Sequence, residues 1–357
     1  MTEVSVSMQD VADAVGVHRT TVSRALRDDP RISEVTRERV KGAADRLGYR
    51  TNPLVAVLMS HRRAVAPARF QAVMAFVTQG RQRGEWAGLA PSFRRIQEAA
   101  AARAERQGYK LEEFWTGGPP WRPETLPRVL IQRGIHGMVI APLRETQGNL
   151  ELDCRPFSCV TIGYSVVSPD VARVAPDHFQ GMNLAMNRCR EFGLTRPGLV
   201  LAEGVHERVG RRWLGAYLAA TTDVKVPPPL VMDAFAPAEF RAWFQKHRPD
   251  VILTARPDPV RAALRGLQVK VPDGVGLVSL EADSAGGVAG IDQHFEKVGA
   301  AAVDLVISML HRGERGGPAD RQLLIEPSWI DGPTLLRRVS PPGKGGNAEI
   351  PTRRACV

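Results

Sequence analysis

The first fifty residues place apolar side chains at helical spacing in three short segments. The apolar stripes are Val11, Ala12 and Val15, then Val22, Ala25 and Leu26, and finally Val40, Ala43, Ala44 and Leu47. Ser7 and Asp10 form a capping-box pattern before the first stripe, and Gly16 breaks that helix. Ser33 is placed to cap the third helix and Gly48 to end it. The pattern therefore predicts three helices, the second beginning near His18.

The second predicted helix carries a polar face opposite its apolar stripe. That face consists of Arg19, Thr20, Ser23, Arg24 and Arg27. Two short helices joined by a tight glycine turn, the second with an outward Arg/Thr/Ser face, are typical of a helix-turn-helix. The same spacing also fits a small helical subdomain with a solvated arginine face, so the pattern alone leaves both interpretations open.

From Phe70 onward, short apolar runs alternate with longer amphipathic stretches. The predicted strands are 72–77, 111–114, 137–141, 158–162, 199–202, 251–254 and 275–280. The predicted helices between them include 92–107, 124–133 and 178–192. This alternation predicts parallel sheets with helices on both faces. Two such lobes with a cleft between them would bind a ligand at the carboxyl ends of the strands.

The length and charge of the chain agree with this interpretation without requiring it. A chain of 357 residues has room for two or three domains, and 43% apolar residues suffice for a buried core. The formal net charge of +10 favours an acidic partner such as nucleic acid. A protein that is simply rich in arginine would carry the same charge.

Several classes of protein are disfavoured by what the sequence lacks. The four cysteines, Cys154, Cys159, Cys189 and Cys356, show no metal-ligand spacing and are expected to be reduced thiols. Neither a secretory signal nor an apolar run of about 18 residues is found, so we expect a cytoplasmic protein without a membrane partner. Phosphate-binding-loop, nucleophile-elbow, zinc-protease and dinucleotide-binding motifs are also missing. We therefore expect neither an enzyme nor a cofactor or metal site.

The first fifty residues, which we call the headpiece, resemble the corresponding segment of the lactose-repressor family of bacterial transcriptional regulators. The matching runs are Met8-Gln9-Asp10-Val11-Ala12, Val15-Gly16-Val17, Thr21-Val22-Ser23-Arg24, Ser33, Thr36-Arg37 and Leu47-Gly48-Tyr49. The chain departs from the family at His18, where a serine usually caps the recognition helix. Histidine caps poorly, but it could contact a DNA phosphate.

Asn52-Pro53 begins another short helix, because Asn is a preferred cap and Pro a preferred first residue. The resemblance implies that this hinge folds on DNA, pairs with its copy in a dimer and presses Leu58 into the minor groove. The alternative is an apolar linker that packs on the following domain. The predicted DNA contacts are Ser7, His18, Arg19, Thr20, Thr21, Ser23 and Arg24 in the headpiece, and Asn52, Val55, Leu58 and Met59 in the hinge.

The resemblance extends more weakly to about Leu336 and implies an effector site. Asp177 and Arg212 stand where the family holds sugar hydroxyls, and Glu281 and Gln293 match further polar positions. The remaining candidates are Thr78, Gln79, Trp86 and Arg256. For Trp86, ordinary packing is an alternative to stacking on a ligand ring.

Arg256 replaces part of an Ala-Asn-Asp run that is common in the family. This departure disfavours a simple neutral sugar as the ligand. An acidic sugar or a phosphorylated compound would explain Arg256 together with Arg212, and so would a salt bridge.

These observations predict an all-α helix-turn-helix headpiece followed by an α/β core with two lobes of parallel sheet, like periplasmic binding proteins. The predicted domains are the headpiece 1–50, the hinge and linker 51–68, the effector-binding and dimerisation domain 69–338 and a disordered basic tail 339–357. The predicted function is transcriptional regulation, by repression in the family's manner, through a homodimer that binds near-palindromic operator DNA and a carbohydrate-like effector. Rival interpretations are a ligand-binding module with a vestigial head, and an enzyme fused to such a head.

Overall fold

A computed structural model describes residues 6–26, 32–49, 72–80, 82–143, 146–283, 287–316 and 321–337. The predicted hinge, with Asn52, Val55, Leu58 and Met59, and the predicted basic tail lie outside the described residues. Contacts divide the chain into two compact units. The first unit comprises Met1–Pro176, Glu207–Gly210 and His294–Ile325, and the second comprises Asp177–His206, Arg211–Gln293 and Glu326–Val357.

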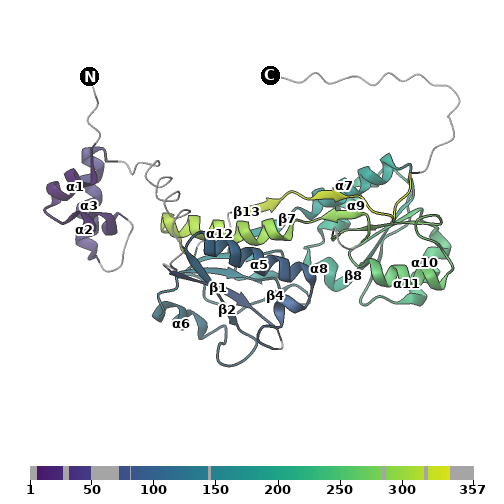
Figure 1. The fold of residues 1–357 in the computed structure, drawn as a ribbon, viewed down its shortest axis with the longest axis horizontal. Coiled ribbons are helices and arrows are strands. Elements are labelled where there is room, and N and C mark those ends of the chain that lie inside the picture. Colours follow the sequence, from purple (N-terminus) through teal and green to yellow (C-terminus); the bar gives the residue numbers. More distant parts are fainter. Residues whose placement is uncertain are drawn as a thin grey trace, which may run out of the picture. The chain divides into compact units, whose positions relative to one another are not determined.

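The headpiece contains the three predicted helices, drawn in purple in Figure 1. They are α1 (Met8–Val15), α2 (Arg19–Ala25) and α3 (Glu34–Leu47). Gly16 and Gly48 end α1 and α3 in the left-handed conformation, with φ of 71° and 69°. The predicted apolar stripes meet in one core, in which Val11, Val22 and Val40 are fully buried. The positions predicted from helical spacing are therefore confirmed.

The first unit also contains a six-stranded sheet in the order β13-β7-β5-β3-β1-β2, with every neighbouring pair parallel. Its strands are β1 (Ala72–Thr78), β2 (Tyr109–Trp115), β3 (Gly137–Ile140), β5 (Ser158–Ile162), β7 (Ala172–Pro176) and β13 (Gln322–Ile325). Two short strands, β4 (Gly148–Asn149) and β6 (Val166–Ser168), pair separately. The helices are η1 (Trp86–Gly88), α5 (Pro91–Arg106), α6 (Leu126–Gln132) and α12 (Phe295–Arg312).

Helices cover both faces of the first sheet, as predicted. Met74 and Phe76 of β1 pack with α5 and α12 in one apolar cluster. Ala75 and Val77, which point to the other face, pack with α6. Figure 1 shows α5 and α12 running side by side.

A glycine allows α5 and α12 to approach closely. A Cβ atom on Gly299 of α12 would lie 2.3 Å from the carbonyl oxygen of Ile96 on α5, which is too close for any larger residue without a backbone shift. Two ion pairs join the same helices, Arg95–Glu296 at 2.6 Å and Arg103–Asp304 at 2.7 Å. The apolar core and these surface pairs together fix α12 along α5.

The second unit contains a six-stranded sheet in the order β14-β12-β11-β10-β8-β9. Its strands are β8 (Pro197–Ala202), β9 (Leu230–Met232), β10 (Val251–Thr254), β11 (Gly276–Ser279), β12 (Gly290–Asp292) and β14 (Ser328–Ile330). Its helices are α7 (His178–Glu191), α8 (Glu203–Arg208, which ends in the first unit), α9 (Arg212–Ala220), α10 (Pro237–His247) and α11 (Pro257–Gly266). Only β14 departs from the parallel arrangement, since it pairs antiparallel with β12.

One face of the second sheet is covered by α10 and α11. Phe240 and Trp243 of α10 and Val260 and Leu264 of α11 pack in one cluster with Ile252 of β10. The other two long helices, α7 and α9, pack against each other, and α7 also contacts β12 and β14. Among the described residues, no helix is both long and apolar enough to cross a bilayer.

Candidate DNA-binding and effector residues

The side chains predicted to read DNA lie on the outer face of α2. His18, Arg19, Thr20 and Arg24 are exposed, whereas Thr21 and Ser23 are half-buried. Val22 and Ala25 of the same helix are completely buried. Residues 6–26 and 32–49 provide no ion-pair partner for Arg19 or Arg24. The helix therefore presents two guanidinium groups that can reach base edges or phosphates.

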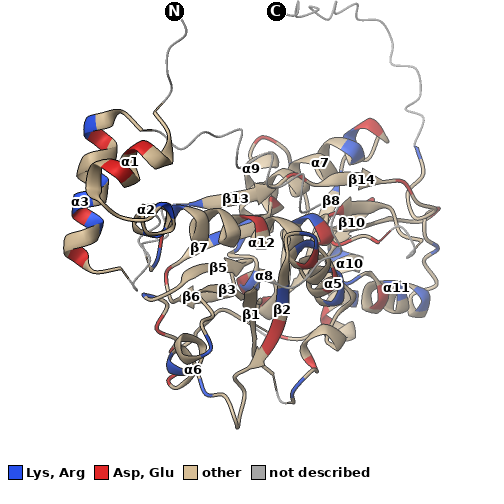
Figure 2. Ribbon diagram, turned by 60° about the vertical axis from the view of Figure 1, so that its left-hand side comes forward, with Lys and Arg blue, Asp and Glu red and all other residues tan. Residues whose placement is uncertain are grey.

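Helix α1 differs from α2 in charge. Between Met8 and Val15 the charged residues are Asp10 and Asp13, whereas α2 carries Arg19 and Arg24. Figure 2 shows this difference as red on α1 and blue on α2. Because DNA is an anion, the basic helix is the one suited to face it.

Ser7 and Asp10 form the predicted capping box at the start of α1. The Ser7 hydroxyl accepts from the Asp10 amide at 3.3 Å, and the Ser7 amide donates to the Asp10 carboxylate at 2.7 Å. This second bond lowers the pKa of Asp10 from its usual value. Ser7 is exposed, so its position also permits the predicted DNA contact.

His18 caps α2 in place of the expected serine. Its Nδ1 accepts from the Thr20 amide at 3.3 Å and lies 2.9 Å from the Thr20 hydroxyl. An acceptor at Nδ1 requires the tautomer that carries its proton on Nε2. The cap therefore leaves the Nε2–H group available for an outside acceptor such as a phosphate oxygen.

In the first unit, the effector candidates have dissimilar surroundings. Thr78 is buried at the end of β1, and its hydroxyl donates to Glu113 at 2.7 Å. Gln79 is exposed. Trp86 is 1% exposed, stacks on Phe93 at 4.5 Å and donates its indole N–H to the Pro142 carbonyl at 2.8 Å.

Trp86 therefore occupies the core of the first unit. Both its ring and its N–H group are used by neighbouring residues, and the described part of the chain buries the ring almost completely, so that it is closed to stacking on a ligand. The packing interpretation of this residue is the one that the structure favours.

In the second unit, Asp177 and Arg212 stand at the beginnings of two helices that pack together. Asp177 caps α7, with Oδ1 accepting from the Gln180 amide at 2.9 Å. Arg212 is the first residue of α9. The next residues along each helix, His178 and Trp213, meet edge to face with ring centroids 5.0 Å apart. Two residues that are 35 positions apart in the sequence are thereby brought to adjoining helix ends.

Gln293 and Glu281 lie near the same helix α7. Gln293 is completely buried at the end of β12, and its Nε2 donates to the Leu280 carbonyl at 2.7 Å, directly before Glu281. A Cβ atom on Gly181 of α7 would lie 3.5 Å from that Nε2 atom. The structure therefore gathers four of the five candidates of this unit around the first turns of α7 and α9.

Arg256, the fifth candidate, is exposed where β10 ends and α11 begins. It lines a small cavity of about 30 Å³ with residues from the carboxyl ends of β8, β9 and β10, among them Ala202, Met232 and Thr254. The carboxyl ends of parallel strands are the usual place for ligands in such sheets. Arg256 thus lies at the expected edge of the sheet.

Trp213 was not among the residues predicted from the sequence. Its indole Nε1 is buried without a hydrogen-bond partner in the described part of the chain, and so is Oε1 of Gln293. Leaving a buried polar group unbonded costs about 1–3 kcal/mol. One unused donor and one unused acceptor, both close to α7, suit a polar ligand. The position of Trp213 directly after Arg212 is a signal that could have identified it.

The described cysteines provide no reactive or metal-binding centre. Cys154, Cys159 and Cys189 are buried free thiols. Burial raises the pKa of Cys189 to about 12, and burial together with the neighbouring Cys154 raises that of Cys159. Among the described residues, no group of three His, Cys, Asp or Glu side chains is placed to hold a metal ion.

Comparison with known proteins gave matches of two kinds. Residues 7–52 match the family described as bacterial regulatory proteins, lacI family. No curated protein matches the sequence. Among solved structures, the transcriptional regulator CelR in complex with cellobiose has a TM-score of 0.59 at 19% identity, covering 92% of this chain and 99% of that one.

Two further solved structures share the fold. The lac repressor dimer bound to operator and the anti-inducer ONPF has a TM-score of 0.56 at 18% identity, covering 93% of this chain and 99% of that one. A periplasmic binding protein/LacI transcriptional regulator from Alkaliphilus metalliredigens, complexed with D-xylulofuranose, has a TM-score of 0.55 at 15% identity, covering 73% and 99%. These likenesses confirm the predicted combination of a helical headpiece and an α/β core of parallel sheets.

Proposed function

We propose that this chain is a member of the lacI family of bacterial regulatory proteins, whose model matches residues 7–52, and that it is a repressor whose affinity for operator DNA is controlled by a small carbohydrate-like effector. The description of this family as regulatory proteins supports a regulator, the function predicted from the sequence. The observation that carries the DNA-binding part is α2, a capped helix with exposed Arg19 and Arg24 and a fully buried opposite face.

Operator binding is tested with the full chain and duplexes taken from upstream regions of its own genome. In a gel-shift assay, one region should compete at least about a thousandfold better than random duplex, as specific sites do. Arg19→Gln/Arg24→Gln should lose this preference. Arg106→Gln, which removes an exposed arginine from α5, is the matched control and should retain it.

The rival function, a ligand-binding module with a vestigial head, predicts a different outcome. In that case the chain would bind an effector while all duplexes competed equally. The exchange of the usual capping serine for His18 is the feature of the headpiece that favours this rival. If the rival function is correct, His18→Ser should leave DNA binding unchanged. If the chain is a repressor, His18→Ser should alter operator affinity measurably, because the cap of the recognition helix is replaced.

The effector part rests on the residues gathered around α7 and α9. Asp177 and Arg212 supply a carboxylate and a guanidinium, and Trp213 and Gln293 supply an unused donor and an unused acceptor. This mixture suits the hydroxyl groups of a sugar or sugar derivative. Solved structures of the same fold hold cellobiose and D-xylulofuranose, which supports the same class of ligand.

A thermal-shift screen of neutral, acidic and phosphorylated sugars on the full chain tests this assignment. The true effector should raise the melting temperature in proportion to the logarithm of its concentration. Arg212→Ala should abolish that response while operator binding without effector stays within about twofold, because α9 and the headpiece are separate elements. An unchanged effector midpoint in Arg212→Ala would assign Arg212 a structural role.

The proposed assembly is a homodimer on a near-palindromic operator, and the lac repressor dimer on its operator has the same fold. Two headpieces related by a twofold axis bind two half-sites, which explains why operators of this kind are palindromic. Effector binding would change the fraction of protein molecules whose conformation can bind the operator. The domain limits 1–50, 51–68, 69–338 and 339–357 belong to the same proposal.

A further inference from the structure

The loop between α11 and β11 lines two adjoining cavities at the amino-terminal edge of the second sheet. The first has a volume of about 680 Å³ and includes Arg261, Arg265, Lys270 and Asp273 in its lining. The second has a volume of about 950 Å³. Both are lined by Gln268, Val269, Lys270 and Asp273, so the two cavities border the same loop, and we call them together the furrow.

This furrow lies at the opposite edge of the sheet from the proposed effector residues. Asp250 and Gly274, which line the second cavity, come just before β10 and β11. Arg256 and Glu281 come just after the same two strands. Because β10 and β11 are parallel, these two pairs of residues occupy opposite ends of the strands. The furrow is therefore a separate place on the second unit.

Among the described residues, three cations in the first cavity have no neutralising partner. Arg261 and Arg265 are one turn apart on α11, and Lys270 lies on the loop that follows. Within the part of the chain that the structure describes, none of the three makes an ion pair or a side-chain hydrogen bond. Like charges four residues apart destabilise a helix. An anion between them would remove this repulsion.

The second cavity adds two more cations at its border. Arg196 is held in place, because it donates to the carbonyl of His247 at 2.7 Å, and Arg248 is exposed beside it. Asp250 faces the same space, but its carboxylate already accepts from the amides of Thr195 and Arg196, at 2.7 and 3.0 Å. Asp273 is then the one lining carboxylate without a described partner.

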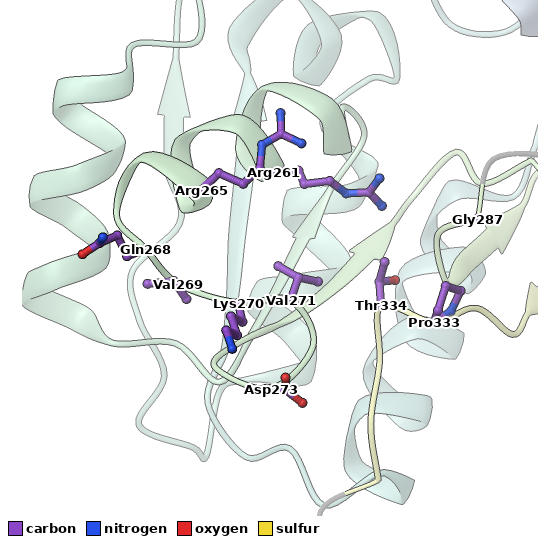
Figure 3. A pocket seen from close by; sticks show the side chains of 10 residues that line it. All are labelled: Arg261, Arg265, Gln268, Val269, Lys270, Val271, Asp273, Gly287, Pro333 and Thr334. Carbon is purple, nitrogen blue, oxygen red and sulfur yellow. The ribbon is translucent and has the colours of Figure 1, made fainter.

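The rest of the first cavity is apolar or already hydrogen-bonded. Val269, Val271 and Pro333 contribute apolar surface. The hydroxyl of Thr334 donates to the Leu277 carbonyl at 2.7 Å and accepts from the Ala289 amide at 2.9 Å. Figure 3 shows the two arginines on α11, Lys270 and Asp273 on the loop, and Pro333 and Thr334 on a separate segment. Three stretches of chain thus border an open cavity of a size usual for small-molecule sites.

We propose that this furrow is a second ligand site, which binds a small molecule bearing a phosphate group and hydroxyl groups. Arg261 and Arg265 would bind the phosphate, and Lys270 would add positive charge from the loop, since guanidinium and ammonium groups are the usual partners of such a dianion. Asp273 accepts from a hydroxyl group of the same molecule. The proposal is independent of the effector site proposed above, because no residue is common to both.

Calorimetric titration of the full chain with glycerol 3-phosphate tests the proposal, with glycerol as the neutral control and citrate as a carboxylate control. We expect binding of glycerol 3-phosphate, weaker at higher ionic strength, and none of glycerol. Arg261→Gln/Arg265→Gln should weaken that binding at least about tenfold, because two charge-assisted contacts are lost. Arg241→Gln/Arg106→Gln removes two exposed arginines that line neither cavity and should leave binding unchanged.

Two further variants separate this site from the others. Arg19→Gln/Arg24→Gln should retain glycerol 3-phosphate binding, which excludes the headpiece as its location, and Arg212→Ala should retain it as well. Equal binding by wild type and Arg261→Gln/Arg265→Gln, both folded by circular dichroism, would overturn the proposal. So would the absence of binding in the wild type, an equal loss in the control pair, or citrate binding as tightly as the phosphate ester.

Discussion

The guanidinium of Arg39 on α3 donates to the carbonyl oxygen of Val15, the last residue of α1, at 3.1 Å. This bond supplies a partner for one of the carbonyl groups that every helix leaves unsatisfied at its end. It also places a positive charge at the negative end of the helix dipole. The turn between α1 and α2 begins at the next residue, Gly16, so the third helix supports the turn of the helix-turn-helix.

Replacing Arg39 by methionine should loosen this turn. The loss of one charge-assisted hydrogen bond at a partly exposed site should destabilise the headpiece by about 1 kcal/mol. Hydrogen exchange of the amides of Gly16 and Val17 in the full chain, measured against amides of β10, reports the change locally. Arg46→Met removes another exposed arginine from α3 and serves as the control. Equal exchange in wild type and Arg39→Met would show that the bond has no role in solution.

Arg19 and Thr20 should determine which operator is preferred. Both are exposed on the recognition helix, and a good bidentate base contact is worth about 1–3 kcal/mol of discrimination. Selection on random DNA should therefore return a different consensus for Arg19→Gln/Thr20→Ala than for the wild type. The same consensus with uniformly weaker binding would instead assign both residues to the phosphate backbone.

Leu58 belongs to the predicted hinge, outside the described residues, and is expected to wedge open the central minor groove. Leu58→Gly removes the wedge and lowers helix propensity. It should reduce operator affinity strongly and leave binding to random duplex, which is mainly electrostatic, nearly unchanged. Leu58→Met should be mild because Met still fills the step. The test measures the affinities for operator and random duplex at one salt concentration and follows DNA bending by fluorescence. If Leu58→Gly bends the operator as much as the wild type does, the hinge is a simple linker.

Glu314 should contribute to stability at neutral pH and lose that contribution in acid. Hydrogen bonds from Arg312 and Arg321 lower the pKa of Glu314 to about 2 from an ordinary value of 4.5. Because the pKa of Glu314 is lower in the folded state than in the unfolded state, ionised Glu314 stabilises the fold at pH values above its unfolded-state pKa. This stabilisation is then lost as the pH falls from about 4.5 toward 2.

Urea unfolding of Glu314→Gln and wild type at several pH values measures this effect. The variant should be less stable at pH 7, and the difference should shrink as the pH approaches 3. Glu98→Gln removes an exposed carboxylate of α5 for which the described residues provide no ion pair. It should show no such dependence. A difference between Glu314→Gln and wild type that stayed constant with pH would contradict the assignment.

Local patterns predicted the elements well where their signal is periodic. The stripe of Val22 and Ala25 and the caps at Ser7 and Ser33 are properties of neighbouring residues, and they appear in the structure as expected. The alternation of buried strands and amphipathic helices likewise predicted the parallel sheets. The antiparallel strand β14 was not foreseen, because strand direction depends on which partner a segment meets and not on its own sequence.

The sequence by itself determined the helix-turn-helix and its basic outer face, because hydrophobic period, capping and charge act within a few residues along the chain. Only the tertiary structure decided which distant side chains meet. It buried the indole of Trp86 against Phe93, placed Trp213 beside His178, and brought Arg261 and Arg265 together with Lys270 and Asp273 in one furrow. Such meetings depend on how strands are ordered and helices packed, and these long-range contacts are not encoded in the spacing of any single segment.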